Sequence, residues 1–338
     1  MYVQQGSHTA TACVTDDDLA QTCGNLSVTI ANVVPTVTAS NHTIDENGLA
    51  TVSGTISDPG LLDAFSLIIN WADGPIDTIA LPAGTQTFSE THQYLDDNPS
   101  GDPSDNYSVA LSANDGVDAG AASATVTVNN VPPSVTISGD TIDENGIATL
   151  NGVITDPGTL DTFDVTIVWG DGASESFSLP ATTTGTTPFS KTHQYLDDNP
   201  TATFSDTYTV SVTVTDDDSG SGSATTFVNV NNVAPVVDAG TFQSVVVQEE
   251  TFTSSGAFTD VGTQDTHTAK VNYGDGSGTT TLTLNPDNTF DLSHAYLYVG
   301  EATTTVEVCD DDGECGVSIA QILILAADPT VTVTGPTP

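Results

Sequence analysis

The stretch Trp169-Gly170-Asp171-Gly172 decides how the rest of this chain is interpreted. In the run before it, Phe163, Val165 and Ile167 alternate with polar residues, and such alternation predicts a β-strand with one apolar face. Because Asp-Gly supplies the positive φ angles that a two-residue turn needs, the strand is predicted to enter a tight hairpin.

Similar landmarks recur with a period near 100 residues. Trp71-Ala72-Asp73-Gly74 lies 98 residues before this stretch and Tyr273-Gly274-Asp275-Gly276 lies 104 residues after it. A fixed period of this kind indicates an array of repeats. The predicted divisions are the C-terminal hairpin of an incomplete repeat (1–33), three repeats (34–131, 132–233 and 234–327), and a linker or the first strand of a further repeat (328–338).

The charge of the chain excludes several classes of function. The formal net charge of the 338 residues is −43, and Lys191 and Lys270 are the only Lys or Arg residues. Binding to nucleic acid or to anionic membranes is not expected, because phosphate contacts need Lys and Arg. No apolar run is long enough to span a bilayer and no signal peptide is recognised, so membrane insertion of this segment is not expected either.

The spacing of strands and turns predicts an all-β fold. About seven short strands per hundred residues, with turn signals every 8–12 residues, are typical of an immunoglobulin-like β-sandwich. The aromatic-Gly-Asp-Gly turn, the His-x-Tyr triplets, the strand Tyr208–Asp216 and the Asn-Val-x-Pro linkers resemble tandem PKD-type repeats of bacterial and archaeal surface proteins. The resemblance covers three repeats and the N-terminal segment, and it is loosest in the third repeat.

Aspartates recur at one end of each predicted repeat. An Asp-x₄-Asp pair in the loop after the second strand and an acidic turn in the last hairpin are predicted to share the proximal end, where the chain enters the repeat. Converging carboxylates suit Ca²⁺, which takes six to eight oxygens at about 2.3–2.6 Å, and the PKD resemblance implies a Ca²⁺ site in the same region. The predicted ligands are Asp58, Asp63 and Asp115 in the first repeat, Asp156, Asp161, Asp216 and Asp218 in the second, and Asp260, Asp265, Asp310 and Asp312 in the third. The alternative is that these residues only form turns, with solvated carboxylates.

The opposite, distal end of the first repeat is also acidic, with Asp45, Glu46, Asp96 and Asp97. In a tandem array this end abuts the proximal end of the next repeat, as in cadherins. The cadherin linker pattern Asp-x-Asn-Asp-Asn is absent, however, so a site within each repeat is expected ahead of a site shared at the junction.

The four cysteines occur as two close pairs, Cys13 with Cys23 and Cys309 with Cys315, and each pair flanks a predicted hairpin turn. Opposite positions on adjacent antiparallel strands suit a disulfide, and disulfides indicate an extracellular setting. Reduced thiols or thiolate metal ligands are the alternatives.

Histidine and tryptophan have structural explanations. His92, His193 and His294 occupy equivalent positions in three repeats, so they are predicted to make local hydrogen bonds and not one metal cluster. Trp71 and Trp169 end predicted buried strands, which favours core packing over stacking on sugars. No catalytic motif is present, and the protein is not expected to be an enzyme.

Together these features predict an extracellular structural or adhesive protein, a stalk or filament segment stiffened by Ca²⁺. The N-terminal hairpin is completed either by another chain in a head-to-tail filament or by neighbouring repeats of a longer protein. The alternative function is a carbohydrate-binding accessory region of a large secreted enzyme, with glycans held on exposed tyrosines such as Tyr2 or Tyr298.

Overall fold

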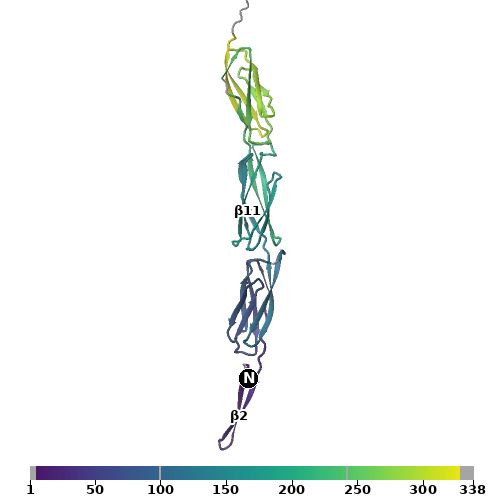
Figure 1. The fold of residues 1–338 in the computed structure, drawn as a ribbon, viewed down its shortest axis with the longest axis vertical. Helices are drawn as coiled ribbons and strands as arrows, with labels where there is room; N and C mark the ends of the chain where they lie inside the picture. The colour runs from purple at the N-terminus through teal and green to yellow at the C-terminus, as the bar shows by residue number, and fades with distance from the viewer. Residues whose placement is uncertain (1–4, 99, 241–242, 328–338) are drawn as a thin grey trace, which may run out of the picture.

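The protein is a row of β-sandwiches. A computed structural model describes residues 5–98, 100–240 and 243–327. Figure 1 shows three sandwiches stacked end to end, with a β-hairpin at the N-terminal end of the row. Every secondary-structure element among the described residues is a β-strand, which confirms the all-β prediction. Among these residues there is no helix that could cross a membrane.

Each sandwich consists of a three-stranded and a five-stranded sheet. In the second repeat the strand orders are β11-β13-β16 and β12-β18-β17-β14-β15, with β12 parallel to β18 and the other pairs antiparallel. The bounds are β11 (Ser134–Ile137), β12 (Asp140–Asp143), β13 (Ile147–Thr155), β14 (Phe163–Val168), β15 (Ser174–Leu179), β16 (Thr186–Gln194), β17 (Ser205–Asp216) and β18 (Ser221–Asn231).

The first and third repeats have the same topology, with sheets β3-β5-β8 and β4-β10-β9-β6-β7, and β19-β21-β24 and β20-β26-β25-β22-β23. The first contains β3 (Thr36–Val37), β4 (His42–Asp45), β5 (Leu49–Ser57), β6 (Phe65–Asn70), β7 (Ile76–Leu81), β8 (Thr87–Gln93), β9 (Ser104–Asn114) and β10 (Ala119–Asn129). The third contains β19 (Val236–Asp238), β20 (Gln243–Val247), β21 (Thr251–Thr259), β22 (Thr268–Asn272), β23 (Thr279–Leu282), β24 (Thr289–Ala295), β25 (Gly300–Cys309) and β26 (Cys315–Leu325).

The aromatic residue before the Gly-Asp-Gly turn anchors each core. Trp169 is 2% exposed and stacks on His193 with ring centroids 4.9 Å apart. His193 Nε2 lies 2.7 Å from Asp171 Oδ2, and the Tyr195 hydroxyl donates to the Trp169 carbonyl oxygen at 2.8 Å. The turn is thereby tied to the end of β16. His92 and His294 make the same contact with the aspartates of their own turns, so the structural interpretation of the three histidines is confirmed.

The N-terminal hairpin consists of β1 (Gly6–Thr15) and β2 (Gln21–Ile30), which pair with each other as a separate two-stranded sheet. Cys13 and Cys23 face each other across this sheet and form a disulfide. Its side chains are mostly exposed. The strand predicted within 328–338, and Tyr2, lie outside the described residues.

Candidate metal centre at the repeat junctions

The proximal end of the second repeat is built from the β13–β14 loop and the β17–β18 turn. Asp156 Oδ1 accepts a hydrogen bond from the Gly158 N–H at 3.0 Å, and Asp216 Oδ1 accepts one from the Gly220 N–H at 2.6 Å. The linker joins this end, because Asn130 Nδ2 donates to Asp216 Oδ2 at 3.1 Å. Turn formation therefore explains one oxygen of Asp156, but it leaves Asp156 Oδ2 without a hydrogen-bond partner.

The distal end of the first repeat meets this surface directly. Glu46, in the turn between β4 and β5, accepts a hydrogen bond on Oε1 from the Val131 N–H at 2.8 Å. The Thr159 N–H of the second repeat donates to the Leu95 carbonyl oxygen of the first at 3.2 Å. The first bond ties the β4–β5 turn to the linker, and the second holds the β8–β9 loop of one repeat against the β13–β14 loop of the next.

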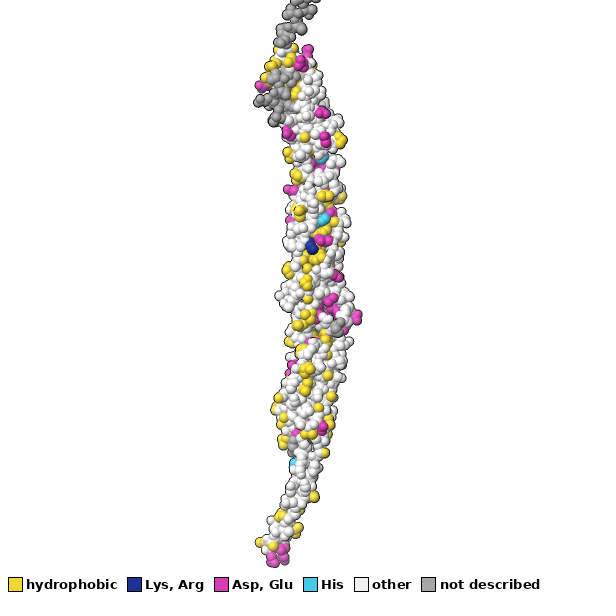
Figure 2. All heavy atoms as spheres, viewed as in Figure 1, with side chains coloured by type: hydrophobic (Ala, Val, Ile, Leu, Met, Phe, Trp, Pro, Cys, Tyr) yellow, Lys and Arg dark blue, Asp and Glu magenta, His cyan; other side chains and the backbone are white. Residues whose placement is uncertain are grey.

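Carboxylates from both repeats converge at this contact. One oxygen each of Glu46, Asp156 and Asp161 lie within 4.8 Å of one another, and Glu46 forms a second such group with Asp96 and Asp97. All five side chains are at most 3% exposed. Glu46 Oε2 and both carboxylate oxygens of Asp161 and Asp97 lack a hydrogen-bond partner. Figure 2 shows Asp and Glu gathered on the surface at the level of this junction.

No basic side chain compensates these charges. Lys191 pairs with Glu175 and Lys270 with Glu307, both within the repeats. Burial raises the pKa of Glu46 to about 8, and the nearby carboxylates of Asp156, Asp96 and Asp97 also raise it. Burial likewise raises the pKa of Asp161, together with its contact with Asp96. Buried carboxylates without a partner are costly, and a divalent cation with oxygen ligands removes that cost.

A glycine makes room for the cluster. A Cβ atom at Gly158 would lie 2.3 Å from Glu46 Oε2 and 2.4 Å from Asp161 Oδ2, so only glycine lets these oxygens converge above the loop. Gly262 is equivalent in the third repeat, where a Cβ would lie 2.2 Å from Glu144 Oε2 and 2.3 Å from Asp265 Oδ2.

The junction between the second and third repeats has the same construction. Glu144 Oε1 accepts from the Val233 N–H at 2.8 Å, and the Thr263 N–H donates to the Leu196 carbonyl oxygen at 3.2 Å. Burial raises the pKa of Glu144 to about 7, with the charge of Asp260 adding to the effect. The buried carboxylates of this junction include Asp197, Asp198, Asp310 and Asp312.

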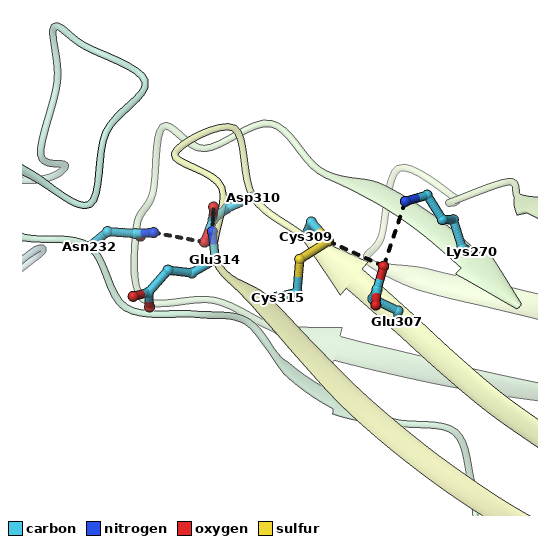
Figure 3. Close-up of a disulfide and its surroundings, with 7 residues drawn as sticks. All are labelled: Asn232, Lys270, Glu307, Cys309, Asp310, Glu314 and Cys315. Atoms are coloured by element: carbon cyan, nitrogen blue, oxygen red, sulfur yellow. Dashed lines mark hydrogen bonds and ion pairs between the residues drawn. A yellow bond between two sulfur atoms is a disulfide. The ribbon is translucent and has the colours of Figure 1, made fainter.

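A disulfide closes the β25–β26 turn next to the second junction. Figure 3 shows the Cys309–Cys315 bond at the base of the β25–β26 turn, and the turn itself carries Asp310. Asn232 in the linker donates through Nδ2 to Asp310 Oδ2 at 3.0 Å. Both predicted disulfides are thus confirmed, and the second one limits the freedom of a turn that contributes acids to the junction.

The proximal end of the first repeat has half of this arrangement. Asp58, Asp63 and Asp115 form a group within 4.8 Å, but no sandwich precedes them in the described residues. Burial opposes ionisation of Asp115, yet hydrogen bonds from Asp118 and Val117 N–H groups and from Asn32 outweigh it and lower its pKa. This carboxylate is stabilised as an anion, in contrast to those at the two junctions.

The structure adds residues to the predicted site. The predicted aspartates lie at the proximal ends, and at the two junctions the preceding repeat contributes carboxylates to their clusters. The preference for sites within single repeats stays a prediction. The added residues are Glu46, Asp96 and Asp97 at the first junction and Glu144, Asp197 and Asp198 at the second. Their signal was present in the repeated Ile-Asp-Glu-Asn-Gly and Leu-Asp-Asp-Asn-Pro motifs.

The two tryptophans considered for sugar binding belong to the core, whereas Phe204 and Phe227 are exposed aromatic residues. Trp71 is fully buried and Trp169 is 2% exposed, which confirms their assignment to the core. Tyr298 is only partly exposed and packs against the core of the third repeat.

Residues 232–324 match the PKD domain family. No curated protein sequence matches the chain. The solved structures to which it is similar include a tetra-tandem repeat in the extending region of a large adhesion protein (20% identity, 96% of this chain and 83% of that chain, TM-score 0.46). They also include protocadherin gamma B2 extracellular cadherin domains 1–5, at 15% identity over 96% of this chain and 67% of that chain with a TM-score of 0.27. A further one is the titin domains Z1Z2 in complex with telethonin, at 17% identity over 60% of this chain and 98% of that chain with a TM-score of 0.31.

Proposed function

We propose that the chain, whose residues 232–324 match the PKD domain family, is a non-enzymatic extracellular stalk whose repeat junctions are stiffened by Ca²⁺. The first two repeats share the topology and the aromatic-x-Asp-Gly turn of the third. The two disulfides support an extracellular setting, since such bonds persist in oxidising compartments.

One observation carries the proposal: Glu46 of one repeat and Asp156 and Asp161 of the next form a single buried group with unpartnered oxygens. Two carboxylates about 4 Å apart repel by roughly 4 kcal/mol at an effective dielectric constant of 20. In the absence of cations this repulsion favours separation of the repeats. A Ca²⁺ ion bound to oxygens from both repeats converts the repulsion into a cross-link and fixes the angle between them.

The test is to compare the full chain in Ca²⁺ with the metal-free chain, by thermal unfolding and by small-angle X-ray scattering. We expect Ca²⁺ to raise the melting temperature and to lengthen the particle, because both junctions become rigid. Mg²⁺ is the matched control, since it keeps its waters and fits irregular oxygen cages poorly. If NaCl at equal ionic strength has the same effect as Ca²⁺, the acids are merely screened and the proposal is wrong.

A further inference from the structure

The carboxylates at each junction fall into two groups that share one glutamate. At the first junction, Glu46 lies with Asp156 and Asp161 on the side of the second repeat and with Asp96 and Asp97 on the side of the first. Glu46 Oε1 is held by the Val131 N–H, whereas Oε2 has no hydrogen-bond partner. A glutamate placed in this way can contribute oxygen to two neighbouring ions.

The second group has its own ligand-seeking side chain. Asp97 is fully buried, and neither of its carboxylate oxygens has a hydrogen-bond partner. The Asp97 and Asp218 side chains, which come from different repeats, lie close enough to interact directly. Asp97, Asp96 and Asp218 therefore offer oxygens from both sides of the junction, and Asp96 also contacts Asp161 of the other group.

The local charge also exceeds what one divalent ion can balance. Apart from Asp216, whose two oxygens accept hydrogen bonds from Asn130 and Gly220, six buried carboxylates meet here: Glu46, Asp96, Asp97, Asp156, Asp161 and Asp218. One Ca²⁺ would leave four negative charges in a region that water reaches poorly, whereas two would leave two. Hydrogen bonds to Asp96 and Asp156 compensate part of that remainder.

We propose that each repeat junction holds two Ca²⁺ ions bridged by one glutamate, Glu46 at the first junction and Glu144 at the second. This inference rests on the proposed function and adds the number of ions and the division of their ligands. The first ion takes Asp156 and Asp161, and the second takes Asp96, Asp97 and Asp218.

The second junction repeats the pattern with different neighbours. Asp198 is fully buried with both oxygens unpartnered, like Asp97. Burial raises the pKa of Asp198 to about 7, and the charge of Asp312 from the next repeat adds to it. Asp265 contacts Asp197 and lies near Glu144, as Asp161 contacts Asp96 and lies near Glu46.

The experiment counts bound Ca²⁺ per full chain by equilibrium dialysis and atomic emission, in about 150 mM NaCl so that exposed charges are screened. Relative to the unmodified protein, Asp97→Asn and Asp156→Asn are each expected to lose one ion. Glu46→Gln is expected to lose two. Asp45→Asn is the matched control and is expected to lose none, since Asp45 is the exposed neighbour of Glu46 in the same turn.

The outcomes separate this inference from the proposed function. If the unmodified chain binds Ca²⁺ but Glu46→Gln loses only one ion, the bridge is wrong while the stalk proposal stands. If millimolar Ca²⁺ does not bind at all, both are wrong. Crystals grown with Ca²⁺ provide a check that needs no variant: two anomalous peaks at each junction support the inference, and a single peak overturns it.

Discussion

The distal ends of the second and third repeats have the same backbone and opposite chemistry. The Glu144 N–H donates to the Asn231 carbonyl oxygen at 2.9 Å, and the Gln248 N–H donates to the Leu325 carbonyl oxygen at 2.9 Å. The next residue has a positive φ in both turns, 56° in the second repeat and 70° in the third. Yet Gln248 replaces Glu144, and Tyr298-Val299 replaces the buried pair Asp197-Asp198.

This comparison shows that the fold does not require the acids. The third repeat forms the same turn and the same core tyrosine contact without them, because the Tyr296 hydroxyl also reaches the carbonyl oxygen of the aromatic turn residue. Turn propensity therefore does not account for Glu144, Asp197 and Asp198. These residues are present in the second repeat, which contacts the third, and they are replaced in the third, the last repeat within the described residues.

The largest expected effect comes from giving the second repeat the distal end of the third. In the variant Glu144→Gln, Asp197→Tyr, Asp198→Val, we expect the second repeat to remain folded, since its sister repeat folds with these residues. The junction should lose both of its proposed Ca²⁺ ions. Small-angle scattering should then show a particle that Ca²⁺ lengthens less, because only the first junction still responds.

Two further variants make this result interpretable. Asp143→Val is the control, because Val247 stands at the equivalent position of the third repeat and the exposed Asp143 belongs to neither ligand group. Glu144→Gln with Asp197→Asn and Asp198→Asn keeps the original side-chain shapes if the first variant unfolds. A normal Ca²⁺ response from a folded variant would mean that the acids do not hold the junction.

The second effect concerns pH in the metal-free protein. Burial raises the pKa of Glu46 from 4.5 to about 8 and that of Glu144 to about 7. A carboxyl whose pKa is raised by folding contributes stability below the unfolded pKa and loses it as pH rises through the folded pKa. The metal-free protein should therefore lose stability between about pH 4.5 and pH 8, and Ca²⁺ should remove that loss.

The measurement is the melting temperature with and without Ca²⁺ at pH 5 and at pH 8. The stabilisation by Ca²⁺ should be larger at pH 8, where the ion replaces the protons that the carboxylates have lost. Gln at both glutamate positions should make the metal-free pH profile less steep, and the remaining slope comes from carboxyls such as Asp198 and Asp265, whose pKa burial also raises. An equal Ca²⁺ effect at the two pH values would show that these carboxyls do not control the junction.

The sequence predicted the sandwiches because side-chain alternation is a local property. Phe163, Val165 and Ile167 are buried on one face as their spacing indicates. It also located Asp156 and Asp161, because an Asp-x₄-Asp loop is local. It did not rank Glu46 as a ligand, since only the contact between repeats brings the β4–β5 turn of one to the β13–β14 loop of the next.

A smaller effect is expected from Gly158→Ala. The added Cβ would crowd Glu46 Oε2 and Asp161 Oδ2, and both side chains must move away from the position they share. We expect a loss of at least roughly tenfold in Ca²⁺ affinity at the first junction, equivalent to about 1.4 kcal/mol. Calorimetric titration measures it.

Gly60→Ala is the matched control for that loop. Gly60 occupies the same position in the first repeat, where a Cβ would approach Asp63 but no glutamate from a preceding repeat. Its effect on the two junction sites should be absent. If Gly158→Ala also left Ca²⁺ affinity unchanged, the oxygens above this loop would not be ligands.

The smallest expected effect distinguishes the two junctions from each other. His267 Nε2 lies 2.9 Å from Asp260 Oδ2, whereas the corresponding position in the second repeat is the buried Phe163, and Asp156 Oδ2 is unpartnered. His267→Phe should free Asp260 and raise Ca²⁺ affinity at the second junction by roughly fivefold, the equivalent of about 1 kcal/mol for one hydrogen bond. The Ca²⁺ affinity is measured by titrating two variants, His267→Phe alone and His267→Phe combined with Glu46→Gln. The second substitution removes Ca²⁺ binding at the first junction. An unchanged or lower Ca²⁺ affinity would show that the Asp260 oxygen released from His267 is not a Ca²⁺ ligand.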